Sequence, residues 1–205
     1  MDRFTVFLID DDAGTLTALS GFLRAAGYAI KTHYSSQAFL SGHDVSIPGC
    51  VILDLSLLGL DGLEVQQSLL DQGVERPAIF ISGKTKAPEI VRAMRAGAID
   101  FLIKPVNESQ LLNAIKAAEE WDSTRRNIEA RRKIVLQKIA ELSKREKEVL
   151  PLMVAGLQSK AIAEKLGTGE KTIKVYRGRI HQKMGVKSLA ELVRMTLGIT
   201  TEDPS

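Results

Sequence analysis

Residues 6–12 read VFLIDDD, four apolar residues followed at once by three aspartates. Three further apolar runs stop in the same abrupt way, each at a polar residue of a different kind: residues 50–53 at Asp54, residues 78–81 at Ser82 and residues 101–103 at Lys104. Short apolar runs of this sort are typical of strands buried on both faces of a parallel sheet. Because ligands bind at the carboxyl ends of such strands, we expect one site there that combines carboxylates, a hydroxyl and an ammonium.

Strand patterns alternate with helix patterns over residues 1–121. We expect strands at five places: residues 4–9, 28–33, 50–53, 77–81 and 99–103. Apolar residues at helical spacing fill the intervals, as Leu16, Leu19 and Leu23 do in the first. Five such units joined by right-handed crossovers predict an α/β fold, with a parallel sheet covered by helices on both faces.

Charge is divided unevenly along the 205 residues. Residues 1–121 hold 10 Lys/Arg and 15 Asp/Glu, a net charge of −5, whereas residues 122–205 hold 18 and 10, a net charge of +8. The two values sum to the +3 of the whole chain. An acidic half followed by a basic half predicts two domains. The second half either meets a polyanion such as nucleic acid or carries a solvated basic surface.

The sequence disfavours a membrane-spanning protein and a protein stabilised by disulfides. No apolar run approaches the ~20 residues of a membrane span. Asp2 precedes the first apolar stretch, so a signal peptide is not expected. The single cysteine, Cys50, lies in an apolar run and is expected to be a small buried hydrophobe in a reducing compartment. We therefore expect a cytoplasmic protein without a membrane partner.

The basic half has no strand pattern. Residues 122–140 are charged and lack Gly and Pro, which favours a helical linker over a partly disordered tether. Residues 141–198 give four short helical segments, and residues 199–205 are expected to be a loose tail. The first segment opens with a capping box, Ser143 with Glu146.

Within this half, a short helix over residues 159–166, a turn and a basic helix over residues 170–184 predict a helix-turn-helix. We expect Ile173, Tyr176, Ile180 and Met184 to face the core of this unit. The basic helix can then enter the major groove of DNA. The alternative is a small helical protein-interaction domain whose lysines are merely solvated.

The acidic site has a definite chemistry. Asp10, Asp11 and Asp54 would form a carboxylate cluster whose pKa values rise unless a cation is present, and Mg²⁺ with oxygen ligands is the usual solution. Asp12 is more simply explained as a helix N-cap. Asp54 can attack phosphorus to give an aspartyl phosphate. The Lys104 ammonium and the Ser82 hydroxyl, at the ends of neighbouring strands, can stabilise the transferring group.

These residues resemble the receiver domain of two-component response regulators over residues 4–121. The likeness rests on four motifs: Ile9-Asp10-Asp11-Asp12, Leu53-Asp54, Ile81-Ser82-Gly83 and Phe101-Leu102-Ile103-Lys104-Pro105. It implies a flavodoxin-like (CheY-like) receiver over residues 1–121 with strand order 2-1-3-4-5, and Asp54 as phosphoacceptor from a sensor histidine kinase. It also implies Mg²⁺ held by Asp11, Asp54 and the backbone carbonyl of Ser56, with Asp10 helping through water. Phe101 would turn inward as the Ser82 hydroxyl moves towards phosphate.

Two positions depart from that family. The loop after the phosphoacceptor reads Leu57-Leu58-Gly59 where relatives usually carry Met-Pro-Gly, and losing proline should loosen it. Lys84 stands where relatives often have small, neutral or acidic residues. Our hypothesis is that Lys84 alters the lifetime of the phosphorylated state. An unchanged dephosphorylation rate in Lys84→Ala would contradict it.

Residues 141–198 resemble the LuxR/FixJ-type (NarL-like) DNA-binding domain. The likeness is carried by these motifs: residues 142–146, 149–150, 155–157, 160–163, 172–176, 183–186 and 191–193. It implies base contacts from Lys174, Val175 and Gly178. Since a larger residue is frequent at the position of Gly178, base reading can shift to Arg179. Contacts to the DNA backbone are implied for four residues: Lys160, Thr172, Arg177 and Lys183. The last helix, residues 188–197, would help the domain dimerise.

We therefore predict a phosphorylation-dependent transcriptional regulator that is not an enzyme. Its partners would be a histidine kinase, double-stranded promoter DNA and a second copy of the chain, with RNA polymerase a further candidate. Two alternatives keep the same architecture: a regulator that ignores phosphorylation, and an output domain that binds protein. A phosphatase using Asp54 is disfavoured, because Ser56 stands where such an enzyme needs a second acid.

Overall fold

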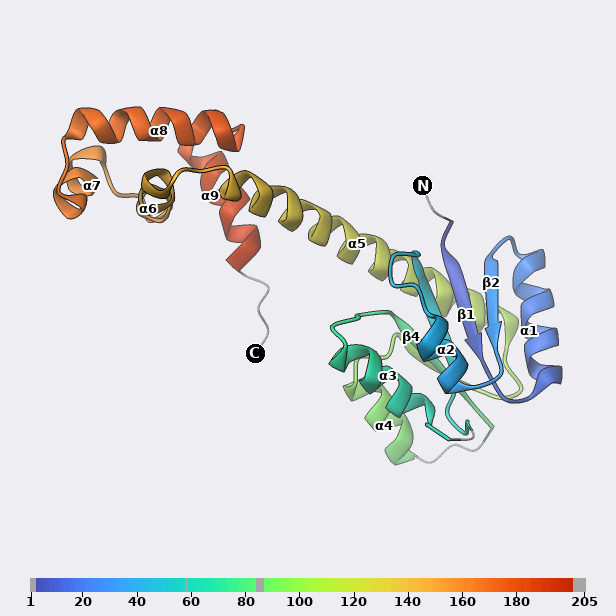
Figure 1. The fold of residues 1–205 in the computed structure, drawn as a ribbon. Helices are drawn as coiled ribbons and strands as arrows, with labels where there is room; N and C mark the ends of the chain where they lie inside the picture. Colours follow the sequence, from blue (N-terminus) through green and yellow to red (C-terminus); the bar gives the residue numbers. More distant parts are fainter. Residues whose placement is uncertain (1–2, 58, 84–86, 201–205) are drawn as a thin grey trace. The chain divides into compact units, whose positions relative to one another are not determined.

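The computed structural model describes residues 3–57, 59–83 and 87–200. The chain divides between Arg125 and Arg126 into two compact units. None of the helices within the described ranges has the length and apolarity of a membrane span. Figure 1 shows the elements of both units in chain order.

The first unit is built on a parallel sheet. Its described strands are β1 (Thr5–Ile9), β2 (Ala29–His33), β3 (Gly49–Asp54), β4 (Ala78–Ser82) and β5 (Asp100–Ile103). They lie in the order β2-β1-β3-β4-β5. β1 is central, with Val6 opposite Ile30 on one side and Cys50 on the other. The predicted fold class and strand order are confirmed.

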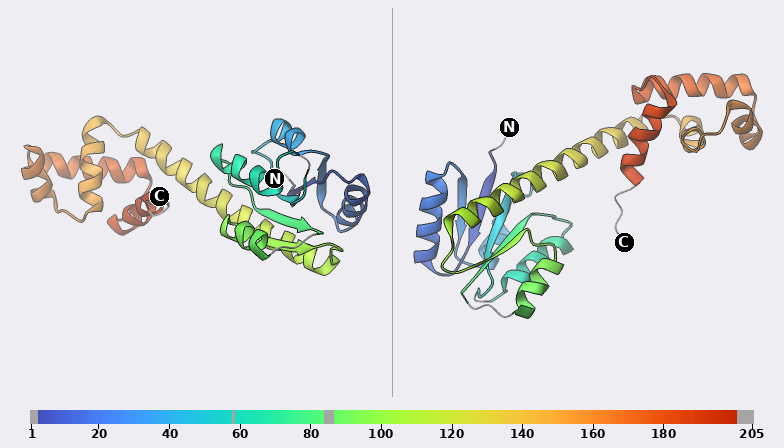
Figure 2. Two further views of the ribbon diagram at one scale, coloured as in Figure 1. Left: turned by 90° about the horizontal axis from the view of Figure 1, so that it is seen from below. Right: turned by 180° about the vertical axis from the view of Figure 1, so that it is seen from behind.

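Helices cover both faces of this sheet. They are α1 (Ala13–Ala25), α2 (Ser36–Gly42), α3 (Gly62–Asp71), α4 (Ala87–Arg95) and the first part of α5 (Glu108–Ala140). Neighbouring strand residues point to opposite faces, so Phe7 and Ile9 pack with the side chains of α2, α3 and α4. Val6 and Leu8 pack with those of α1 and α5. Figure 2, in the view from behind, shows α1 and α5 on that second face.

Predicted helix starts have the expected chemistry. The Asp12 side chain accepts a hydrogen bond from the Thr15 amide and caps α1.

Cys50 is fully buried, and burial raises the pKa of its thiol, so it behaves as the expected inert hydrophobe.

The amino ends of the strands hold a buried cation that the sequence patterns did not indicate. Arg76 is 6% exposed, and its Nε donates to His43 Nε2 at 2.8 Å. Its guanidinium lies 4.6 Å from the centre of the Phe7 ring. Burial, with a contribution from Arg76, lowers the pKa of His43 to about 4. His43 is therefore neutral at pH 7 and serves as the acceptor for this buried arginine.

The second unit is helical. It contains the end of α5, then α6 (Lys144–Val154), α7 (Ser159–Leu166), α8 (Glu170–Met184) and α9 (Leu189–Thr200). Residues 122–140, where we expected a helical linker, lie within α5, and Val135 packs in the core of this second unit. The capping box of Ser143 and Glu146 is present at the start of α6. Gly167, with φ of 63°, ends α7, and α8 follows directly to complete the helix-turn-helix.

Gly49 allows the close approach of β1 and β3. A Cβ atom at this position would lie 1.9 Å from the Thr5 carbonyl oxygen, and the Gly49 amide donates to Asp122 Oδ2 of α5 at 3.2 Å. The strands cannot keep their register around such an atom.

We therefore predict that Gly49→Ala lowers the free energy of unfolding by at least about 2 kcal/mol through overpacking. Gly21→Ala is the matched control, because an added Cβ on this exposed face of α1 meets nothing within 4 Å. It should raise stability by roughly 0.5–1 kcal/mol. Urea unfolding of both variants checks this, and equal stability of the two would contradict the packing argument.

Candidate functional site

The carboxyl ends of the strands bring three predicted site residues to one edge of the sheet. β1 ends at Ile9, directly before Asp10, while β3 and β4 end at Asp54 and Ser82 themselves. All three polar residues are buried, at 5%, 7% and 0% exposure respectively. The sheet is parallel, so the polar ends that the sequence separates lie together in space.

Lys104, directly after β5, joins the two carboxylates. Its Nζ lies 2.9 Å from Asp10 Oδ2 and 2.5 Å from Asp54 Oδ2. The other oxygens accept backbone hydrogen bonds, Asp10 Oδ1 from the Asp12 amide at 2.9 Å and Asp54 Oδ1 from the Ser56 amide at 2.8 Å. Every carboxylate oxygen of the pair thus accepts a hydrogen bond.

One ammonium does not fully compensate two buried acids. Burial raises the pKa of Asp10 even though Lys104 and the Asp12 amide act against it. The pKa of Lys104 is also raised: burial alone would lower it, but its bonds to Asp54 and Asp10 prevail. For Lys104 the favourable bonds therefore outweigh the effect of burial, whereas for Asp10 they do not. The two carboxylates and the one ammonium together keep a net negative charge, which favours a further cation.

The remaining predicted residues of this site, where described, are more exposed than Asp10, Asp54 and Ser82. Asp11 is exposed, and among the described residues no three His, Cys, Asp or Glu side chains gather as a group of metal ligands. Ser56 is exposed, and Phe101 is half-buried against the core beneath α2 to α4. Leu58 and Lys84, to which we assigned effects on the phosphorylated state, lie outside the described residues.

Sequence reasoning missed Gly62 at the start of α3. A Cβ there would lie 2.8 Å from the Asp54 carbonyl oxygen and 3.0 Å from the Phe80 ring. Asp61 caps α3 and forms a capping box with Glu64, which fixes this helix start against the Asp54 backbone. The signal was available, since Asp61 and Glu64 have the capping-box spacing.

The second candidate site is the surface of α8. Ile173, Ile180 and Met184 are fully buried, as predicted, and anchor one face of the helix. Tyr176, predicted to lie on the same face, is half-buried against this core. The predicted base-contacting residues all lie on the exposed part of the helix: Lys174, Val175, Gly178 and Arg179. Lys174 forms an exposed pair with Glu170 at 2.7 Å, an interaction of little energetic weight.

The four predicted backbone-contacting residues are not equivalent. Lys160 and Thr172 are exposed. Arg177 Nη1, however, donates to the Leu157 carbonyl at 3.1 Å and so ties α8 to the segment between α6 and α7. Lys183 Nζ lies 2.7 Å from Glu146 Oε2, a carboxylate in a 2% exposed residue, and hydrogen bonding to Lys183 lowers the pKa of Glu146. Two of the four side chains therefore have structural partners within the unit.

A pH-dependent stability follows from the Lys104 pair. Replacing Lys104 by Met leaves Asp10 and Asp54 without their ammonium and raises the pKa of Asp10 further. A carboxyl whose folded pKa is raised stabilises the fold below its unfolded pKa of 3.8, and this contribution is lost as the pH rises through the folded value. Lys104→Met should thus be about 2 kcal/mol less stable than the parent at pH 7, with a smaller deficit at pH 5.

Urea unfolding at both pH values measures this deficit. Lys116→Met, which changes an exposed lysine on α5, is the control and should show no deficit at either pH. A Lys104→Met deficit that does not change with pH would show that packing of the lysine stem, not its charge, is responsible.

Comparisons with known proteins assign both units to known families. Residues 6–116 match the model of the response regulator receiver domain, and residues 140–196 match that of bacterial regulatory proteins of the luxR family. Nodulation protein W of Bradyrhizobium diazoefficiens is 40% identical, with 95% of this chain and 87% of that protein covered. Transcriptional regulatory protein FixJ of Azorhizobium caulinodans is 37% identical, with 96% and 93% covered.

A solved structure shares both parts of the fold. The response regulator StyR matches with a TM-score of 0.83 and 38% identity, over 95% of this chain and 98% of that one. The chain belongs to the two-component response regulators that combine a receiver domain with a LuxR-type DNA-binding domain.

Proposed function

We propose that this protein is a promoter-binding transcriptional regulator switched by phosphorylation of Asp54. The observation that carries the proposal is the Asp54 carboxylate, buried at the strand edge with the Lys104 ammonium 2.5 Å away. The same chain presents a basic helix, α8, whose outward residues are exposed. One unit can accept a charged group, and the other unit can bind a polyanion.

The transfer itself needs little from the protein beyond position and charge. An Asp54 oxygen attacks the phosphorus of a phosphohistidine on the kinase, an O–P bond forms, and the N–P bond breaks as the imidazole leaves. Lys104 would neutralise charge on the phosphoryl oxygens. Ser82, fully buried at the end of β4, would interact with the new group through its hydroxyl.

Magnesium fits the donor chemistry of this edge. Mg²⁺ prefers oxygen ligands and is commonly held by one or two carboxylates, waters and a substrate phosphate. Asp10, Asp11 and Asp54 would hold it, together with the backbone carbonyl of Ser56. The net negative charge that Lys104 leaves on Asp10 and Asp54 supports a second cation. Bound there, the ion would supply charge neutralisation for phosphoryl transfer.

Phosphorylation would change the surface through the shared lysine. A phosphoryl group on Asp54 would compete with Asp10 for Lys104. The Ser82 hydroxyl would then move towards the phosphoryl group, and the Phe101 side chain would turn inward. Val91 and Met94 on α4 and Ile103 on β5 are 48%, 46% and 54% exposed. This apolar face would pair two receivers, so that two basic units occupy neighbouring DNA half-sites in the cytoplasm.

We expect Asp54→Asn to abolish labelling by acetyl phosphate with Mg²⁺, because an amide is a far weaker nucleophile than a carboxylate. The parent should gain one phosphoryl group by intact mass, become dimeric and bind DNA more tightly. The DNA is a duplex selected from a random pool by the treated protein, and the three readouts are intact mass, light scattering and fluorescence anisotropy.

Asp71→Asn, on the exposed end of α3, is the matched control and should be labelled like the parent. A parent that is labelled without dimerising or gaining DNA affinity would support the regulator that ignores phosphorylation. Binding to no duplex at any salt concentration would favour the protein-binding output domain.

The two groups of DNA contacts should separate in their salt dependence. Lys160→Ala should weaken binding to all sequences alike and reduce the slope of log K against log salt by about one, because a phosphate contact is lost. Arg179→Ala should instead narrow the affinity ratio between the selected duplex and its point variants at one base position. Titrations at four salt concentrations test both variants, and an unchanged sequence preference in Arg179→Ala would remove this residue from the base-reading set.

A further inference from the structure

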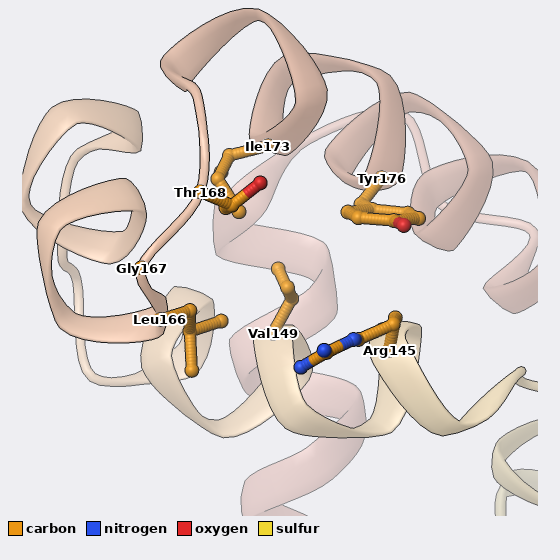
Figure 3. A pocket seen from close by; sticks show the side chains of 7 residues that line it. All are labelled: Arg145, Val149, Leu166, Gly167, Thr168, Ile173 and Tyr176. Atoms are coloured by element: carbon orange, nitrogen blue, oxygen red, sulfur yellow. The ribbon is translucent and has the colours of Figure 1, made fainter.

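A pocket of about 120 Å³ opens beside the helix-turn-helix. Residues from α6, from the end of α7 and the turn after it, and from α8 line it. They are Arg145, Val149, Leu166, Gly167, Thr168, Ile173 and Tyr176. Figure 3 shows the Arg145 side chain along one side, with the Tyr176 ring across from it and the Thr168 hydroxyl near Ile173. The pocket lies wholly within the second unit.

Its polar groups suit an anion. The Arg145 guanidinium presents several N–H donors, and the hydroxyls of Thr168 and Tyr176 can donate as well. Arg145 and Thr168 are exposed, so an anion can reach them from solvent, and hydrogen bonds that join a guanidinium to an anion are stronger than neutral ones. A phosphate oxygen held by a guanidinium and two hydroxyls matches this set.

Arg145 is available for such a ligand. Its Nη1 lies 2.7 Å from Glu148 Oε2, but the two side chains are 66% and 44% exposed. Exposed pairs three residues apart on a helix contribute little and yield readily to a stronger acceptor. A phosphate diester carries a full negative charge, and its oxygens can accept hydrogen bonds from the planar guanidinium.

The position of the pocket selects the kind of anion. Tyr176 follows Val175 on α8, and Thr172, a predicted backbone-contacting residue, lies one turn earlier on the same side of the helix. A recognition helix in the major groove has a phosphate backbone along each flank. Lys183 is tied to Glu146, whereas Arg145 lines the pocket together with Tyr176 and can offer a cation to the backbone on this flank.

We infer that this pocket binds one DNA-backbone phosphate per protomer, through Arg145 with the hydroxyls of Tyr176 and Thr168. The inference rests on the proposed DNA-binding function and adds a contact that the sequence did not indicate. The contact between Arg145 and the phosphate would position α8 in the major groove. A carboxylate on a partner protein has similar chemistry, but the net charge of +8 in residues 122–205 favours the polyanion.

The test uses the full-length protein, treated with acetyl phosphate and Mg²⁺, on its selected duplex. Arg145→Gln should weaken binding on the order of tenfold at physiological salt and reduce the salt slope by about one per protomer, with the ratio between related sequences unchanged. Tyr176→Phe should weaken binding less and leave the slope intact, since it removes a hydroxyl and no charge. Lys147→Gln, an exposed lysine of α6 that does not line the pocket, is the control and should keep the parental slope.

A scan with single methylphosphonates, which neutralise one phosphate at a time, locates the contact. Replacing one particular phosphate per half-site by methylphosphonate should weaken binding of the parent protein. The same replacement should not weaken binding of Arg145→Gln. Glu148→Gln should strengthen binding several-fold, because it frees Arg145 and removes a nearby negative charge.

Three outcomes would overturn the inference while leaving DNA binding in place. They are an unchanged salt slope in Arg145→Gln, a methylphosphonate profile identical to that of the parent, and equal loss in Lys147→Gln. Normal DNA binding by Arg145→Gln would also assign the pocket to another partner. Absence of DNA binding by the parent itself would instead overturn the proposed function.

Discussion

The shared Lys104 ammonium is the interaction on which the receiver unit depends. Asp10 and Asp54 lie at the ends of adjacent strands, β1 and β3, and the parallel register leaves no room to separate their charges. Two buried carboxylates without a cation would oppose the pairing of the central strands. Since one lysine serves both, the site is stable yet still attracts positive charge. The negative charge of Asp10 and Asp54 therefore has two effects. The fold needs Lys104 to neutralise it, and the same charge allows the site to accept a metal ion and then a phosphoryl group.

The second unit divides its cations between folding and binding. Lys183 and Arg177 hold α8 to the rest of the unit through Glu146 and the Leu157 carbonyl. Lys138 of α5 also holds the carboxyl end of α8, because its Nζ donates to the Met184 carbonyl at 2.8 Å. The net basic charge therefore overstates the number of side chains that can meet DNA. The exposed cations on and beside α8 are the relevant set.

Much of the fold was predictable because periodic patterns reflect burial. The apolar runs before Asp10 and Asp54 became β1 and β3, and the caps at Asp12 and Ser143 formed as expected. The partners of charged residues were not predictable in the same way. Lys183 and Glu146 are 37 residues apart in the chain, and no local rule pairs them. Likewise, three aspartates in a row gave no sign that Asp10 would be buried and Asp11 exposed, since this depends on where the chain turns after β1.

The division of α8 into a buried and an exposed face has an evolutionary consequence. Ile173, Ile180 and Met184 pack in the core of the unit. Val175, in contrast, is 47% exposed, and a Cβ atom added at Gly178 would have no neighbouring atom within 4 Å. Substitutions on the exposed face can accumulate at little cost in stability. Duplicated copies of such a gene can therefore drift to new promoters while every copy keeps the same architecture and the same phosphorylation chemistry.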